Sequence, residues 1–171
     1  SDRADPERTK GERNLKILVD ADACPVKEII VRIAKSHGIP VTMLMDTCHV
    51  LDDGYSTVII VDKGRESADL RLVNLIEPGD LVVTQDYGVA AMSLGRGAEA
   101  LNQNGMVYGA DNMDRLLFER ALGQKIRRAG GRAGKNRKRT GEDDQSFERE
   151  LEKMIREVKR PEEKFSYGPD L

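Results

Sequence analysis

The sequence predicts an α/β fold with a mostly parallel sheet and helices on both of its faces. Between residues 15 and 97, short apolar runs alternate with stretches of helical periodicity, which is the pattern of βαβ units. The chain has 171 residues, of which 39% are apolar, so it can form one sizeable core with tails. A second full domain is therefore excluded.

The predicted elements follow in chain order. Four apolar runs predict strands: LKILV at 15–19, VTMLM at 41–45, TVIIV at 57–61 and LVVT at 81–84. Pro25 and Gly38 bracket the first helix, because proline is favoured at a first helical position and glycine just past the last turn. A second helix begins near Ser67 and ends at Pro78-Gly79, and YGVAAMSLG predicts a third at 87–95.

The last part of the chain has a different character. A short strand is predicted at 99–102 and a helix at 111–129, after which GGRAG predicts a flexible basic linker. Thr140 is the expected N-cap of a final helix that ends near Arg160. We expect three regions: a disordered leader at 1–14, a domain at 15–129, and a basic linker with a terminal helix at 130–171. The domain should fold without this third region.

Composition excludes several classes of protein. No run approaches the roughly 18 consecutive apolar residues of a membrane span, and the first 14 residues lack the apolar core of a secretory signal. Cys24 and Cys48 are too few for a disulfide scaffold and lack the CxxC spacing of a zinc site. We therefore expect a cytoplasmic protein with reduced thiols.

Each of four predicted strands runs into an aspartate. These residues are Asp20, Asp46, Asp62 and Asp86. The ends of parallel strands lie on one edge of the sheet, which is where doubly wound proteins bind ligands. Clustered carboxylates repel one another unless a hard cation such as Mg²⁺ or Mn²⁺ offsets their charge. We expect a metal site and place its ligands, which are also the candidate catalytic residues, at Asp20, Asp22, Asp69 and Asp86, with Asp46 and Asp62 farther out.

The positive charge is concentrated in one segment. The formal charge is −2, but residues 125–139 contain eight Lys or Arg and no acid, so the remainder carries −10. Such a segment predicts contact with a polyanion, and we expect RNA. The candidate RNA-binding residues are Lys63 and Arg65 at the acidic edge, and Arg127, Arg128, Arg132, Lys135, Arg137, Lys138 and Arg139 in the basic segment. Lys63 and Arg65 could equally balance the carboxylates.

Four stretches of the sequence resemble the bacterial YaiI/YqxD family. They are VDADACPVKEII, HVLDDGYSTVIIVDKGRESADLRLVNLI, GDLVVTQDYGVAAMSLGRGAEALNQNGMVY and RLLFERALGQKIRRAGGR. The resemblance covers residues 15–155. It implies a relationship to PIN-like (NYN-related) domains, which have a three-layer fold with a mostly parallel sheet and helices on both faces. Their acidic cluster binds Mg²⁺ or Mn²⁺ and cleaves RNA.

The resemblance also assigns roles to particular residues. It matches the first-strand acid of PIN-like domains to Asp20 with Asp22 beside it, the helical acid to Asp69, and the acid after the fourth strand to Asp86. This sequence has a DxD pair where many PIN-like domains have one aspartate, and TQDYG has no second nearby acid. These departures leave the number of metal ions open.

Three functions remain open. The first is a metal-dependent, ribonuclease-like protein that cleaves RNA phosphodiester bonds. The second is a catalytically silent RNA- or ribosome-binding module. The third is a phosphatase of haloacid dehalogenase type, with Asp20 as nucleophile and Asp22 as general acid, although TQDYG lacks the paired acids that this class needs.

Overall fold

A six-stranded sheet forms the centre of the molecule. The computed structural model describes residues 15–46, 53–62, 67–131 and 137–159. The strand order is β3-β2-β1-β4-β5-β6, and only β5 and β6 pair antiparallel. The strands are β1 (Ile17–Asp20), β2 (Val41–Met45), β3 (Thr57–Ile60), β4 (Leu81–Val83), β5 (Glu99–Leu101) and β6 (Val107–Tyr108). The predicted α/β fold class is confirmed.

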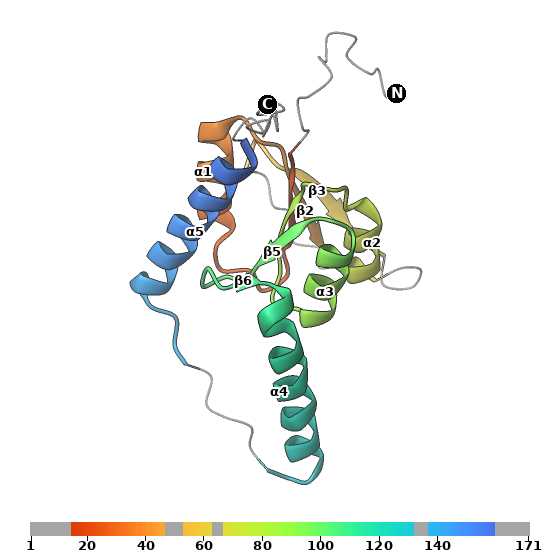
Figure 1. Cartoon of the computed structure of the whole chain (residues 1–171). Helices are drawn as coiled ribbons and strands as arrows, with labels where there is room; N and C mark the ends of the chain where they lie inside the picture. The colour runs from red at the N-terminus through yellow and green to blue at the C-terminus, as the bar shows by residue number, and fades with distance from the viewer. Residues whose placement is uncertain (1–14, 47–52, 63–66, 132–136, 160–171) are drawn as a thin grey trace, which may run out of the picture.

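Helices cover both faces of the sheet (Figure 1). The helices of one face are α1 (Lys27–His37) and α5 (Gly141–Lys159), and those of the other are α2 (Ala68–Leu75), α3 (Tyr87–Gly95) and α4 (Ala110–Arg128). Successive side chains of a strand point to opposite faces. Ile17 and Val19 of β1 therefore join the core beneath α1 and α5, whereas Leu18 joins the core beneath α2 and α3.

The strand order reverses direction beside β1. From β1 the chain moves outward through β2 to β3, and α2 then carries it back across the sheet to β4 on the other side of β1. The carboxyl ends of β1 and β4 therefore flank the switch point, where a doubly wound sheet leaves a crevice for a ligand.

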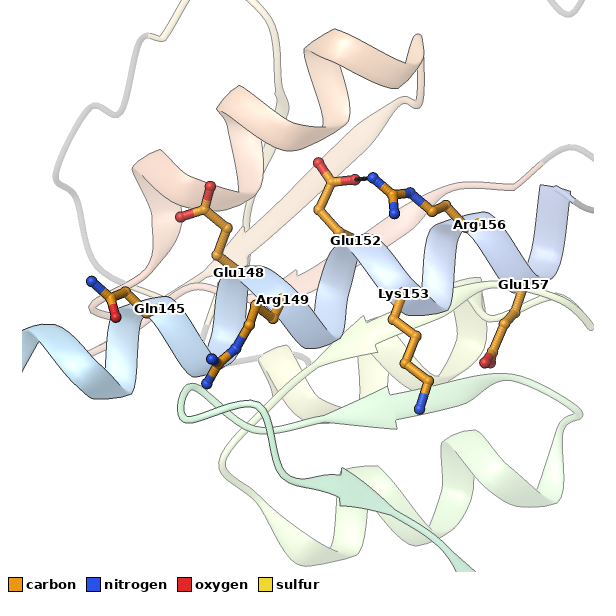
Figure 2. A pocket seen from close by; sticks show the side chains of 7 residues that line it. All are labelled: Gln145, Glu148, Arg149, Glu152, Lys153, Arg156 and Glu157. Carbon is orange, nitrogen blue, oxygen red and sulfur yellow. Dashed lines mark ion pairs between the residues drawn. The ribbon is translucent and has the colours of Figure 1, made fainter.

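The outer face of α5 is charged (Figure 2). A surface hollow runs along this helix, lined by Gln145, Glu148, Arg149, Glu152, Lys153, Arg156 and Glu157. Charges of both signs alternate there, and Glu152 pairs with Arg156 at 3.8 Å. Glu148 and Glu152 also hold α5 to α1, through Arg32 at 2.9 Å and His37 at 2.9 Å. We assign no ligand site to this hollow, because Glu148, Glu152 and Arg156 already have charged partners.

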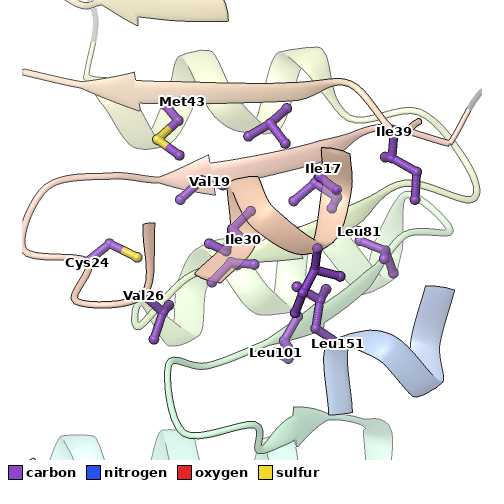
Figure 3. Close-up of a cluster of buried hydrophobic side chains, with 14 of the residues drawn as sticks. Ile17, Val19, Cys24, Val26, Ile30, Ile39, Met43, Leu81, Leu101 and Leu151 are labelled. Carbon is purple, nitrogen blue, oxygen red and sulfur yellow. The ribbon is translucent and has the colours of Figure 1, made fainter. Parts of the chain in front are cut away.

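The inner face of α5 belongs to the main core. Its buried apolar side chains, at most 2% exposed, are Phe147, Leu151, Met154 and Ile155. Figure 3 shows Leu151 beside Leu101 in the cluster that α1 covers. The predicted final helix is confirmed, and its buried stripe shares one core with the predicted domain of residues 15–129. The helical spacing of these four residues buries one stripe of α5 against the sheet.

The hairpin of β5 and β6 contacts the start of α5. The carboxamide oxygen of Asn102 accepts hydrogen bonds from the backbone of Asn104 and Met106, both at 2.9 Å. Gly105 has a φ of +83°, and a Cβ there would lie 2.6 Å from the carbonyl oxygen of Ser146. The turn therefore requires glycine both for its backbone conformation and for close contact with α5.

Some predictions concern residues outside the described part of the chain. The leader at 1–14, Cys48 and the stretches 47–52 and 63–66 all lie there. Cys24 is described and is a buried free thiol. Among the described helices, none has both the length and the apolar character that crossing a membrane requires.

Candidate functional site at the carboxyl edge of the sheet

Thr84 connects the ends of β1 and β4 at the switch point. Its hydroxyl donates to Oδ2 of Asp20 at 3.2 Å and accepts a hydrogen bond from the backbone N–H of Asp86 at 3.0 Å. The Thr84 residue is only 2% exposed, so this link is shielded from water. The carboxylate of Asp20 is thereby held close to the backbone of Asp86, although the two residues are 66 positions apart in the chain.

The loop after β1 is attached to both neighbouring strands. Oδ2 of Asp22 accepts a hydrogen bond from the backbone N–H of Asp46, just past β2, at 2.7 Å. The carbonyl oxygen of Ala23 accepts one from the side chain of Gln85, just past β4, at 3.2 Å. Ala23 has a φ of +57°, a left-handed conformation that costs energy for a residue with a Cβ. The loop is therefore held in a strained shape beside Asp20.

Asp86 caps helix α3. Its Oδ1 accepts hydrogen bonds from the backbone N–H groups of Gly88 at 2.7 Å and Val89 at 3.1 Å, as an N-cap aspartate does. Its Oδ2, like Oδ1 of Asp20, accepts no hydrogen bond from the described residues. Among the described residues, therefore, the fold holds one oxygen of each carboxylate and gives the other no hydrogen-bond donor.

Asp69 approaches the same edge from helix α2. Ser67 caps that helix by accepting a hydrogen bond from the backbone of Leu70 at 3.1 Å, which leaves Asp69 in the first turn. A carboxylate is favoured there by the helix dipole.

Burial and the negative charges of neighbouring aspartates raise the pKa of Asp20 and of Asp69. Burial raises the pKa of Asp20 from its ordinary 3.8 to about 6, against the hydrogen bond from Thr84, which lowers it. The negative charges of Asp69, Asp86 and Asp22 contribute to this rise. Burial also raises the pKa of Asp69, with further contributions from Asp86 and Asp46. The four aspartates that the sequence predicts therefore act on one another's charge.

The donor set suits a hard cation by its chemistry. Carboxylate oxygens are the ligands that Mg²⁺ and Mn²⁺ prefer, and a cation would relieve the repulsion that raises the pKa of Asp20. Within the residues that the structure describes, however, no three His, Cys, Asp or Glu side chains lie close enough together to hold a metal ion. A bound ion would have to draw the carboxylates inward from the positions that their hydrogen bonds set.

The predicted RNA-binding residues fall into three groups. Lys63, Arg65, Arg132 and Lys135 lie outside the described residues. Arg127, Arg128 and Lys138 are exposed. Arg137 donates to Asp143 at 2.6 Å, and Arg139 donates to Asp144 at 2.8 Å, Asn104 at 2.7 Å and the carbonyl of Gln103 at 2.7 Å. These last two arginines fasten the start of α5, and Arg139 joins it to the β5–β6 hairpin.

Two residues near the aspartates, Thr84 and Arg120, were not predicted from the sequence. Thr84 carried a recognisable signal, since it is a polar residue at the end of an apolar strand and two positions before Asp86. Arg120 carried none. It lies on α4, and its positive charge lowers the pKa of Asp69 against the effect of burial. Because 51 residues separate Arg120 from Asp69, only the tertiary structure brings the two charges together.

The fold and this cluster define a doubly wound α/β protein with carboxylates at its switch point. The chain belongs to the YaiI/YqxD family, whose model, described as "Uncharacterized BCR, YaiI/YqxD family", matches residues 18–157. This match confirms the family resemblance.

Several relatives share most of the chain. The UPF0178 protein of Ruminiclostridium cellulolyticum is 66% identical over 137 residues, which are 80% of this chain and 90% of the relative. That of Alkaliphilus oremlandii is 54% identical, with coverage of 80% and 88%. That of Clostridium acetobutylicum is 50% identical over 143 residues, with coverage of 82% and 97%. No solved structure matches the chain.

Proposed function

We propose that this chain is a metal-dependent, ribonuclease-like protein that cleaves RNA phosphodiester bonds at the aspartate cluster. One observation carries the proposal: Asp20 and Asp86 are joined through Thr84 at the switch point, with Asp22 and Asp69 close enough to raise the pKa of Asp20. Carboxylates placed close together destabilise the fold by repelling one another, and a bound cation would offset this repulsion. The resemblance to PIN-like domains supports the same function.

The residues of the cluster would divide the work. Asp20, Asp22, Asp69 and Asp86 would hold Mg²⁺ or Mn²⁺, which when bound supplies a Lewis acid that activates water and stabilises the charge of the transition state. Thr84 orients Asp20 through its hydroxyl. The backbone N–H groups at the start of α3 hold one oxygen of Asp86 and so fix where the other points.

The positive charges of helix α4 favour RNA as the substrate. It brings Arg120 close to Asp69 and presents Lys125, Arg127 and Arg128 to solvent at its C-terminal end. Cations along this helix would contact the phosphate backbone of an RNA that extends away from the aspartates. Phosphate contacts of this kind position a nucleic acid without reading its sequence.

A catalytically silent RNA-binding module is the second candidate. The observation in its favour is that no three acidic or other metal-binding side chains of the described residues lie at the spacing of a metal site. In this case the same cations would bind RNA, and the acidic edge would only shape the surface.

One assay separates the two functions. Labelled single-stranded and structured RNAs are incubated with the protein in Mn²⁺, Mg²⁺ or EDTA, together with Asp20→Asn and the control Glu77→Gln. Glu77 is an exposed carboxylate at the opposite sheet edge, paired with Lys16 at 3.3 Å. Metal-dependent cleavage that Asp20→Asn abolishes and Glu77→Gln retains would support the nuclease. RNA binding without cleavage in either metal would refute it and favour the silent module.

A further inference from the structure

Helix α4 exposes an unusual number of apolar side chains. Of the large apolar residues that are exposed in the described part of the chain, four belong to this helix: Leu117, Phe118, Leu122 and Ile126. Phe118 is 67% exposed. Figure 1 shows α4 extending away from the sheet and from the other helices. Such a concentration of apolar surface marks a contact with another molecule.

Three of these residues form a line along the helix. Phe118, Leu122 and Ile126 are four positions apart, so they lie above one another on the same side of α4. The side chains that α4 buries, Met113 and Leu116, belong to its first two turns. Between Leu117 and Arg128 no residue is buried. A helical segment of this length is marginal in water without packing, and Gly123 in its interior weakens it further.

The charges of α4 are divided along its length. The first half, 110–119, contains Asp111, Asp114 and Glu119 against one arginine, Arg115. The second half, 120–128, contains Arg120, Lys125, Arg127 and Arg128 and no acid. Two copies of this helix placed antiparallel, with Phe118 opposite Ile126, would therefore bring Glu119 of each copy against Lys125 of the other. A parallel pair would oppose like charges instead.

We infer that the Phe118–Leu122–Ile126 stripe of α4 binds the same stripe of a second copy of this chain. The two helices pack antiparallel about a two-fold axis near Leu122, which places Phe118 of each copy against Ile126 of the other. An isologous contact of this kind is closed and makes a dimer. RNA would engage the cations of α4 but would leave the apolar line uncovered, so it is the weaker candidate for this face.

The first test is the oligomeric state of the full chain. Sedimentation equilibrium over a wide range of protein concentrations is expected to give a dimer for the wild type. Leu122→Glu should raise its dissociation constant at least about tenfold, because the substitution buries an unpaired charge at the centre of the contact. The control is Ile60→Glu on β3. Ile60 is 55% exposed, and this variant should leave the dimer intact. A monomeric wild type, or a dimer that only Ile60→Glu dissociates, would overturn the inference.

A charge-reversal experiment tests the antiparallel arrangement. One variant carries Glu119→Lys and the other carries Lys125→Glu, because an axis near Leu122 places Glu119 of each copy against Lys125 of the other. Each should be monomeric alone, because like charges then meet on both sides of the axis, whereas an equal mixture should form a heterodimer. Both residues are exposed, so circular dichroism should show an unchanged fold. If each variant alone keeps the wild-type dimer, or if the mixture stays monomeric, α4 is not the interface.

Discussion

The buried carboxylate of Asp20 lowers the stability of the folded protein at neutral pH. Its pKa in the folded protein is about 6, against an ordinary 3.8. The folded state therefore holds the proton more tightly than the unfolded state. The destabilisation that Asp20 causes is therefore absent below pH 3.8, grows as pH rises from about 4 to 6, and persists at neutral pH.

Replacing this carboxylate should stabilise the protein. We expect Asp20→Asn to raise the free energy of unfolding at pH 7 by roughly 1 to 2 kcal/mol, a value reduced for the partial exposure of the group. Urea unfolding without divalent ions at pH 7 and pH 4 measures this, and the gain should shrink at pH 4. A variant that is less stable at pH 7 would show that Asp20 is mainly a structural residue.

Ala23 is a second strained residue beside the site. Glycine can adopt this residue's φ of +57° at little steric cost. We expect Ala23→Gly to raise the free energy of unfolding by about 0.5 kcal/mol, because relief of strain exceeds the added freedom of the unfolded chain. The matched control is Ala91→Gly inside α3. This variant should lower the free energy of unfolding by about 1 kcal/mol. Equal losses in the two variants would contradict the strain at Ala23.

At the scale of elements, α5 is part of the core. We expect Leu151→Ala to lower the free energy of unfolding by about 2 to 4 kcal/mol, because Leu151 is fully buried in the main cluster and its truncation leaves a cavity. Glu157→Ala, on the exposed side of the same helix, should change it by less than about 0.5 kcal/mol. Denaturant titrations compare the two variants. Similar values for both would mean that α5 does not contribute to the cooperative unit.

The basic segment is divided between structure and binding. Arg139 has three hydrogen-bond partners, Asp144 on α5 and Asn104 and Gln103 in the β5–β6 hairpin, whereas Arg128 is exposed at the end of α4. We expect Arg139→Ala to cost about 1 to 2 kcal/mol of stability and to leave the salt dependence of RNA affinity unchanged.

Arg128→Ala should do the reverse. Stability should be kept, and the slope of log affinity against log salt should fall by about 1, since one phosphate contact is lost. RNA titrations at several salt concentrations measure this slope. If the two variants change the slope equally, the division between structural and RNA-binding arginines fails.

At the scale of the whole molecule, the site connects separate segments. Asp20 ends β1, Asp69 belongs to α2 and Asp86 caps α3, so a shared ion would join them. Saturation of such a site at a hundred times its dissociation constant should stabilise the fold by about 2.7 kcal/mol. Thermal unfolding with Mn²⁺ should show a higher midpoint for the wild type but not for Asp20→Asn. Equal shifts in both would place the ion elsewhere.

The elements themselves could be predicted because their signals are local. Gly38 predicts the end of the first helix and does adopt the left-handed conformation at its C-cap, whereas Pro25, predicted at the first helical position, lies two residues before Lys27, where α1 begins. Strand-end aspartates could also be predicted, because an apolar run and the acid after it are recognised without reference to the rest of the chain. The antiparallel β6 was not predicted, since its two residues are too few to show a strand pattern.

By itself, the sequence determined the α/β class, the final helix and the aspartates at the strand ends, because periodicity and capping depend on neighbouring residues. Only the tertiary structure decided that Thr84 links Asp20 to Asp86, that Arg120 lies close to Asp69, and that α5 completes the core. These contacts join residues that are far apart in the chain. They depend on strand order and helix packing, which the hydrophobic pattern of any single segment leaves undetermined.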